Sequence, residues 1–163
     1  MLTKPEPPPE AERARAICAA HGDRPDALIE ILHDVQHDLG FVPEVALPAI
    51  ANALNLSRAE VHGVVSFYHD FRRTPPGRHV VQICRAESCQ SMQSDALCDH
   101  AKASLKTGFG ETSADGDVTL QAVYCLGNCA LSPAMMVDGK LYGRVNPQRF
   151  DQIMTRTREG SQS

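Results

Sequence analysis

The sequence predicts a chain of α+β and α/β character, with a helical bundle followed by an α/β domain of element order β-α-β-β-β-α. Apolar residues recur at helical spacing between residues 10 and 70, and the segment Thr74-Pro-Pro-Gly77 then ends that periodicity. Strand-like apolar runs follow. The 163 residues can bury two small cores. We therefore expect a disordered tail at 1–9, the bundle at 10–73, the α/β domain at 78–157 and a tail at 158–163.

The first domain should contain a series of amphipathic helices. Four prolines within residues 1–9 exclude a regular element there, and a short helix is expected from Glu10 to about Ala20. A clearer helix follows Pro25 and ends at Gly40; its apolar stripe is Leu28, Ile31, Leu32, Val35 and Leu39. Another is expected from Pro43 to Asn55. The last begins at Ser57, which forms a capping-box pattern with Glu60. Since no such helix buries its stripe alone, an antiparallel bundle is expected.

The second domain begins with an apolar strand, His79–Ile83, that ends at Cys84. A helix from Met92 to Leu105 and a polar connection over 110–117 lead to a second strand at 118–123. Asp138-Gly139 predicts a hairpin, and a final helix is expected from Pro147. A right-handed crossover makes the first two strands parallel and places their carboxyl ends at one sheet edge. Open α/β sheets commonly place their sites at such an edge.

Charge and hydropathy narrow the class of protein. The net charge is −4 with both signs spread along the chain, so nucleic acid is not an expected partner. No apolar run reaches the roughly 18 residues of a membrane span, and the proline-rich start does not resemble a secretory signal. We therefore expect a cytoplasmic protein without membrane insertion. In that compartment, six cysteines indicate metal binding or redox chemistry rather than disulfides.

Two cysteine pairs are the candidate site. Four residues separate Cys84 from Cys89, three separate Cys125 from Cys129, and 35 residues lie between the pairs. The predicted crossover brings both pairs to one sheet edge. A 2Fe-2S cluster takes two thiolates on each iron, whereas a structural zinc ion takes four thiolates itself. The spacings favour iron–sulfur and leave zinc open, while the Cys-x-x-Cys motif of a dithiol redox site is absent.

Other chemically capable residues have simpler explanations. Cys18 and Cys98 fall within helical segments and are expected to be core residues. His33 and His37 share a helix face but lack a third ligand in a recognisable motif, so exposed positions are expected. The aromatic stretch Phe67–Phe71 is expected to serve packing or an interface. No phosphate-binding glycine loop stands out, so NAD binding by this chain alone is not expected.

Together these motifs resemble a known family. Val61-His-Gly-Val-Val-Ser-Phe-Tyr-His-Asp-Phe71, the first cysteine pair, and Cys125-Leu-Gly-Asn-Cys129 followed by Pro133 are similar to the thioredoxin-like 2Fe-2S subunit of the NADH dehydrogenase module of complex I. The resemblance covers about residues 25–150. Cys84-Arg-Ala-Glu-Ser-Cys89 with Cys125-Leu-Gly-Asn-Cys129-Ala-Leu-Ser-Pro-Ala most resembles the gamma subunit of soluble, molybdenum-containing NAD-dependent formate dehydrogenase.

This resemblance implies a thioredoxin-like domain that holds one 2Fe-2S cluster on Cys84, Cys89, Cys125 and Cys129. The chain would be a non-catalytic electron-transfer subunit of an enzyme that converts formate and NAD+ to CO2 and NADH. A flavoprotein partner would carry FMN, the NAD site and a 4Fe-4S cluster, and a large partner would carry the molybdenum cofactor. The alternatives are the equivalent subunit of an NAD-reducing hydrogenase or of complex I, a free-standing ferredoxin, or a zinc-stapled interaction module.

Overall fold

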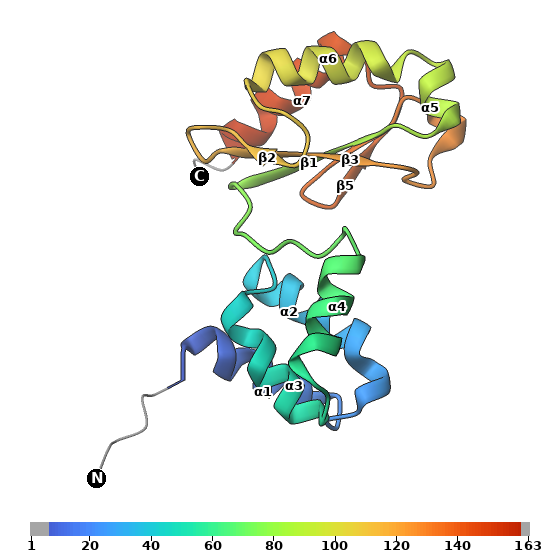
Figure 1. Ribbon diagram of the computed structural model, residues 1–163. Helices are drawn as coiled ribbons and strands as arrows, with labels where there is room; N and C mark the ends of the chain where they lie inside the picture. The colour runs from blue at the N-terminus through green and yellow to red at the C-terminus, as the bar shows by residue number, and fades with distance from the viewer. Residues whose placement is uncertain (1–6, 161–163) are drawn as a thin grey trace. The chain divides into compact units, whose positions relative to one another are not determined.

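The computed structural model describes residues 7–160, and the chain divides into two compact units after Pro75 (Figure 1). The predicted tails fall largely on residues 1–6 and 161–163, which lie outside the described residues. Some described residues that were predicted as tail belong to helices. Helix α1 (Pro9–Ala20) already begins at Pro9, a first-turn position that needs no N–H donor. Helix α7 (Pro147–Gly160) extends through residues 158–160, because no glycine or proline interrupts it before Gly160.

The first unit consists of helices joined by short turns. After α1 come α2 (Leu28–Leu39), α3 (Leu47–Leu54) and α4 (Arg58–Phe67). Short 3-10 turns, η1 (Pro25–Ala27) and η2 (Glu44–Ala46), precede α2 and α3, so the two helices predicted at 25–40 and 43–55 each start later than expected. The capping box of α4 is confirmed: Glu60 N–H donates to Ser57 Oγ at 3.2 Å, and Ser57 N–H donates to Glu60 Oε2 at 2.8 Å.

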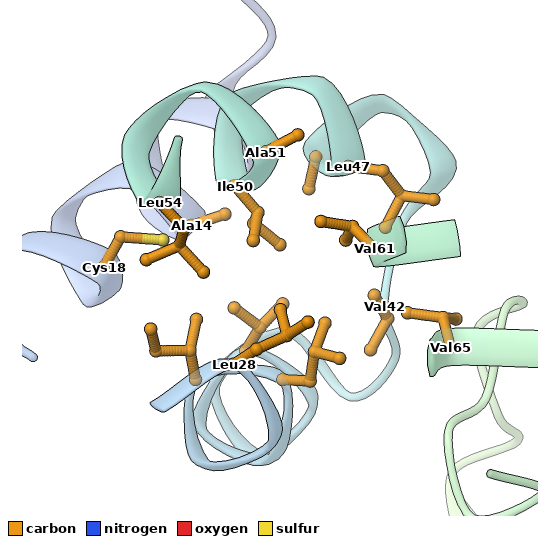
Figure 2. Packing of buried hydrophobic residues seen from close by; sticks show 14 of the residues in the cluster. Ala14, Cys18, Leu28, Val42, Leu47, Ile50, Ala51, Leu54, Val61 and Val65 are labelled. Carbon is orange, nitrogen blue, oxygen red and sulfur yellow. The ribbon is translucent and has the colours of Figure 1, made fainter. Parts of the chain in front are cut away.

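One apolar core holds this unit together. Helix α1 packs against α2 and α3, and α4 packs against α3 and α2. Figure 2 shows side chains from all four helices directed into this core, among them Ala14, Leu28, Ile50 and Val61. A buried amide ties the chain after α4 to α2: Gln36 Nε2 donates to the carbonyl of Asp70 at 2.9 Å, and Gln36 Oε1 accepts from Arg72 N–H at 2.6 Å. The antiparallel arrangement of these helices stays a prediction.

The second unit contains a five-stranded mixed sheet in the order β2-β3-β1-β4-β5. The strands are β1 (His79–Cys84), β2 (Glu111–Thr112), β3 (Val118–Val123), β4 (Met135–Val137) and β5 (Lys140–Tyr142). Strands β1 and β3 are parallel, as the crossover predicted, and β4 and β5 form the hairpin predicted at Asp138-Gly139. Strand β2 lies in the segment that was predicted as a connection. It was missed because two residues are too few to show an alternating pattern.

Helices cover this sheet and complete its core. Helix α5 (Glu87–Ser91) and the 3-10 turn η3 (Cys129–Leu131) were not predicted, and α6 (Ser94–Leu105) begins later than the expected Met92. Gln93 has a positive φ of 67°, which separates α5 from α6. Helices α6 and α7 pack side by side on one face of the sheet (Figure 1). Their side chains Leu97 and Phe150 join Ile83 and Leu120 in the core.

None of the helices within residues 7–160 combines the length and the apolar character needed to cross a bilayer.

Candidate metal centre

The cysteine pairs lie at one edge of the sheet because β1 and β3 are parallel. The register places Cys84, the last residue of β1, opposite Val123, the last residue of β3. Cys125 follows Val123 by two residues. Both strands therefore end at the same edge of the sheet, and the first cysteine of each pair lies at or just after the end of its strand.

The first pair is buried. Cys84 and Cys89 are each 2% exposed, and Cys89 lies on α5, a helix that the sequence did not predict. Burial raises the pKa of the Cys84 thiol, and the adjacent Cys89 thiol adds to this effect. The backbone amides of Ala86 and Leu126 act in the opposite direction on this pKa, and Leu126, from the other cysteine segment, packs against the hydrophobic cluster that contains Cys84 and Cys89. The two segments therefore meet at Cys84.

The second pair lies at the surface. The Sγ atoms of Cys125 and Cys129 are 3.9 Å apart, and both residues are exposed. Two thiolates on one tetrahedral metal, each about 2.3 Å from it, lie about 3.8 Å apart. The pair therefore already has the spacing that one metal ion requires. The neighbouring Cys125 thiol is the main cause of the raised pKa of Cys129, and Cys89 also contributes.

Backbone conformation shapes the loop between Cys125 and Cys129. Cys125 has a φ of 135° and Gly127 a φ of 72°, both in the region that favours glycine. This turn directs the Gly127 N–H to the Cys125 sulfur, with N and Sγ 3.3 Å apart. Amide donors to sulfur are typical of iron–sulfur sites, where they stabilise the charge on the thiolates.

Two serines that the sequence did not single out connect the pairs. Ser132 Oγ lies 3.6 Å from Cys89 Sγ and donates to the Cys129 carbonyl at 2.8 Å. Ser88 Oγ lies 2.9 Å from Ser132 Oγ and 3.2 Å from the same carbonyl. The sequence contains one clue to these serines, which is their distance from the cysteines: Ser88 directly precedes Cys89, and Ser132 follows Cys129 by three residues.

The donor set fits two metals held by two pairs. Within residues 7–160, no three or more Cys, His, Asp or Glu side chains are gathered closely enough to hold a metal ion. A 2Fe-2S cluster requires two thiolates for each iron and amide donors near the sulfurs. Residues Cys84, Cys89, Cys125 and Cys129 could hold such a cluster, and the Gly127 amide already donates to one of their sulfurs.

The other candidates lie elsewhere. Cys18 is fully buried in the core of the first unit, where burial raises its pKa to about 11. Cys98 lies on α6 and is buried in the core of the second unit, as expected of a packing residue. His33 and His37 are exposed, as expected, and His33 Nδ1 lies 4.0 Å from a carboxylate oxygen of Asp70.

The aromatic stretch at the end of α4 is divided between core and surface. Phe71 is buried, whereas Phe67 is 74% exposed and packs edge-on against Tyr68. The structure of this unit therefore gives Phe71 a packing role and leaves Phe67 at the surface.

Comparison with known proteins gives the family. The sequence profile of the thioredoxin-like 2Fe-2S ferredoxin family matches residues 14–158. An NADH-quinone oxidoreductase subunit of Pseudomonas aeruginosa is 40% identical over 128 residues, which cover 78% of this chain and 77% of the relative. The NADP-reducing hydrogenase subunit HndA of Solidesulfovibrio fructosivorans is 32% identical over 127 residues, which cover 78% and 74% of the two chains.

A solved structure is also similar. The match is to a chain of an NAD+-reducing NiFe-hydrogenase in its air-oxidised state, with a TM-score of 0.70 and 25% identity. It covers 82% of this chain and only 23% of the hydrogenase chain, so this chain corresponds to about a quarter of that larger protein. Given the profile match over most of its length and the two relatives above 30% identity, this chain belongs to the thioredoxin-like 2Fe-2S ferredoxin family.

Proposed function

We propose that this chain is an electron-transfer subunit that holds one 2Fe-2S cluster on Cys84, Cys89, Cys125 and Cys129. It would work within an NAD(P)-linked oxidoreductase complex, such as an NADH-quinone oxidoreductase or an NAD(P)-reducing hydrogenase. The observation that carries this proposal is the parallel pairing of β1 with β3, which brings two cysteine pairs to one sheet edge. Family membership and the 3.9 Å separation of the Cys125 and Cys129 sulfurs support it.

The two cysteine pairs would give such a cluster one buried side and one side at the surface. A bound 2Fe-2S cluster supplies a one-electron couple, whose potential depends on hydrogen bonds to sulfur, burial and local charge. Cys84 and Cys89 are shielded from water, whereas Cys125 and Cys129 lie at the surface, where a partner's redox centre can approach. The proposed partner is a flavoprotein with FMN, an NAD site and a 4Fe-4S cluster.

The formate dehydrogenase assignment stays a prediction. The similar proteins reported above belong to NADH-quinone oxidoreductases and hydrogenases. They support the alternative, an equivalent subunit of complex I or of an NAD-reducing hydrogenase, better than formate dehydrogenase. The relatives and the solved structure described above do not support the molybdenum-containing partner. The genes beside this one provide a direct test. A molybdopterin-type dehydrogenase gene would favour formate as the substrate, and a NiFe-hydrogenase gene would favour dihydrogen.

Purification of the full chain without oxygen tests the cluster. We expect a red-brown protein with two iron and two sulfide per chain, as a 2Fe-2S cluster requires. A colourless protein with one zinc per chain would contradict the proposal and favour a structural staple.

The ligand assignment has its own test. Cys84→Ser and Cys125→Ser should each deplete iron and sulfide while the first unit keeps its helical circular dichroism. Cys18→Ala is the matched control, because Cys18 is buried in the other unit and should leave the iron content unchanged. Full cluster content in both serine variants would remove those residues from the ligand set.

A further inference from the structure

Ser132 is a buried hydroxyl group between the two cysteine pairs. It is 7% exposed, and its Oγ lies 3.6 Å from Cys89 Sγ, within hydrogen-bond reach of a sulfur atom. The same oxygen contacts the Cys129 carbonyl at 2.8 Å and Ser88 Oγ at 2.9 Å. Ser132 therefore contacts a side chain of one pair and the backbone of the other.

The number of available protons decides what this hydroxyl does. When Cys89 is a thiol, its S–H can donate to Ser132 Oγ, and the single Ser132 proton goes to the Cys129 carbonyl. A metal-bound cysteine has lost its proton and can only accept. The contact between Ser132 and Cys89 then remains a hydrogen bond only if the serine donates.

Ser88 makes this change possible without leaving an acceptor unpaired. Its Oγ lies 3.2 Å from the Cys129 carbonyl, the same acceptor that Ser132 uses. When Ser132 turns its proton toward Cys89, Ser88 can donate to that carbonyl. Two hydroxyl protons then serve two acceptors, which matters because an unpaired buried acceptor destabilises the site.

We propose that, in the cluster-bound protein, Ser132 donates a hydrogen bond to the Cys89 sulfur and thereby raises the reduction potential of the cluster. The inference rests on the proposed function. Hydrogen bonds to a charged acceptor strengthen with its charge, so the bond stabilises the reduced cluster more than the oxidised one. One electron enters on reduction, no covalent bond breaks, and the proton stays on Ser132. Ser132 is thus a tuning residue and not a ligand.

The test uses the full chain purified without oxygen, with iron and sulfide measured for each variant. In Ser132→Ala, the ratio of reduced to oxidised cluster at a fixed potential should fall about fivefold to tenfold, which corresponds to about 40 to 60 mV for a one-electron couple. An EPR-monitored redox titration measures this shift. The Fe–S(Cys) stretching bands in resonance Raman spectra should also respond less to D2O, and Ser132→Thr should restore both properties.

Two further variants keep the test decisive if Ser132→Ala loses its cluster. In Ser88→Ala, Ser132 must return its proton to the Cys129 carbonyl, so the potential should again fall. Ser91→Ala is the matched control, since Ser91 Oγ donates only to the Ser88 carbonyl on the same helix and should change nothing. Cluster-containing Ser132 and Ser88 variants with unchanged potentials would overturn this inference alone. A wild-type chain without iron would overturn the proposed function and this inference with it.

Discussion

Gly143→Ala should disturb the second cysteine pair from outside it. Gly143 lies just after β5, and a Cβ there would come within 2.6 Å of Leu131 Cβ, 2.8 Å of Asn128 Nδ2 and 2.9 Å of the Leu131 carbonyl oxygen. Non-bonded carbons prefer about 3.5 to 4.0 Å, so Leu131 must move by about 1 Å. The next residue holds the chain in place, because Arg144 N–H donates to the Leu131 carbonyl at 2.6 Å.

Overpacking of this kind costs about 1 to 3 kcal/mol. The segment that must move is η3, which begins at Cys129, so the strain falls on a proposed ligand. We expect the rate of hydrogen exchange in peptides around η3 to rise by the factor to which a free energy of about 1 to 3 kcal/mol corresponds. We also expect a chelator to remove iron faster. Both measurements use the full chain without oxygen.

Gly63→Ala is the matched control. Gly63 lies inside α4 with no atom within 4 Å of an added Cβ, so alanine should stabilise that helix by about 0.5 to 1 kcal/mol and leave iron retention unchanged. If Gly143→Ala leaves exchange around η3 and iron retention at wild-type values, the close approach does not constrain η3 and the reasoning is wrong.

Two further predictions use other properties of the chain. Gly127→Ala should cost about 1 to 2 kcal/mol through its φ of 72° alone, since an added Cβ meets nothing within 4 Å. Asparagine adopts a positive φ more readily than alanine, so Gly127→Asn should release iron to a chelator more slowly than Gly127→Ala does. Equal release rates in the two variants would contradict a conformational cause. Burial raises the pKa of Cys18 to about 11, so the unfolded chain releases this proton first, and the stability of the first unit should fall between about pH 9 and 11. Denaturant unfolding should show a smaller fall in Cys18→Ala; an identical fall would contradict this.

The sequence predicted elements best where a periodic pattern was long. The stripe of α2 and the strands β1 and β3 repeat over enough residues to show their period. Helix α5 has five residues and β2 has two, so neither contains a full repeat of apolar positions. The 3-10 turn before α2 was missed for a related reason: Pro25 fits the first turn of either helix type, and only the hydrogen bonding distinguishes them.

The candidate site was predictable in place but not in detail. Cysteine spacing and the handedness of the crossover placed both pairs at one edge. The contact of Ser88 with Ser132 joins residues 44 positions apart, and the close approach of Gly143 to Leu131 depends on how the hairpin turns back. Such contacts follow from tertiary packing, and a single sequence carries no local pattern for them.

The strand order gives the first cysteines of the two pairs different backbone surroundings. Strand β1 lies between β3 and β4. Cys84 N–H donates to the Ala134 carbonyl at 3.0 Å on one side, and Arg85 N–H donates to the Val123 carbonyl at 2.8 Å on the other. The backbone at Cys84 is therefore fixed from both directions. Cys125 lies beyond the end of β3, where the sheet imposes no pairing and a positive φ can be adopted. The same topology thus fixes the backbone of Cys84, whereas the loop that begins at Cys125 must be shaped by Gly127.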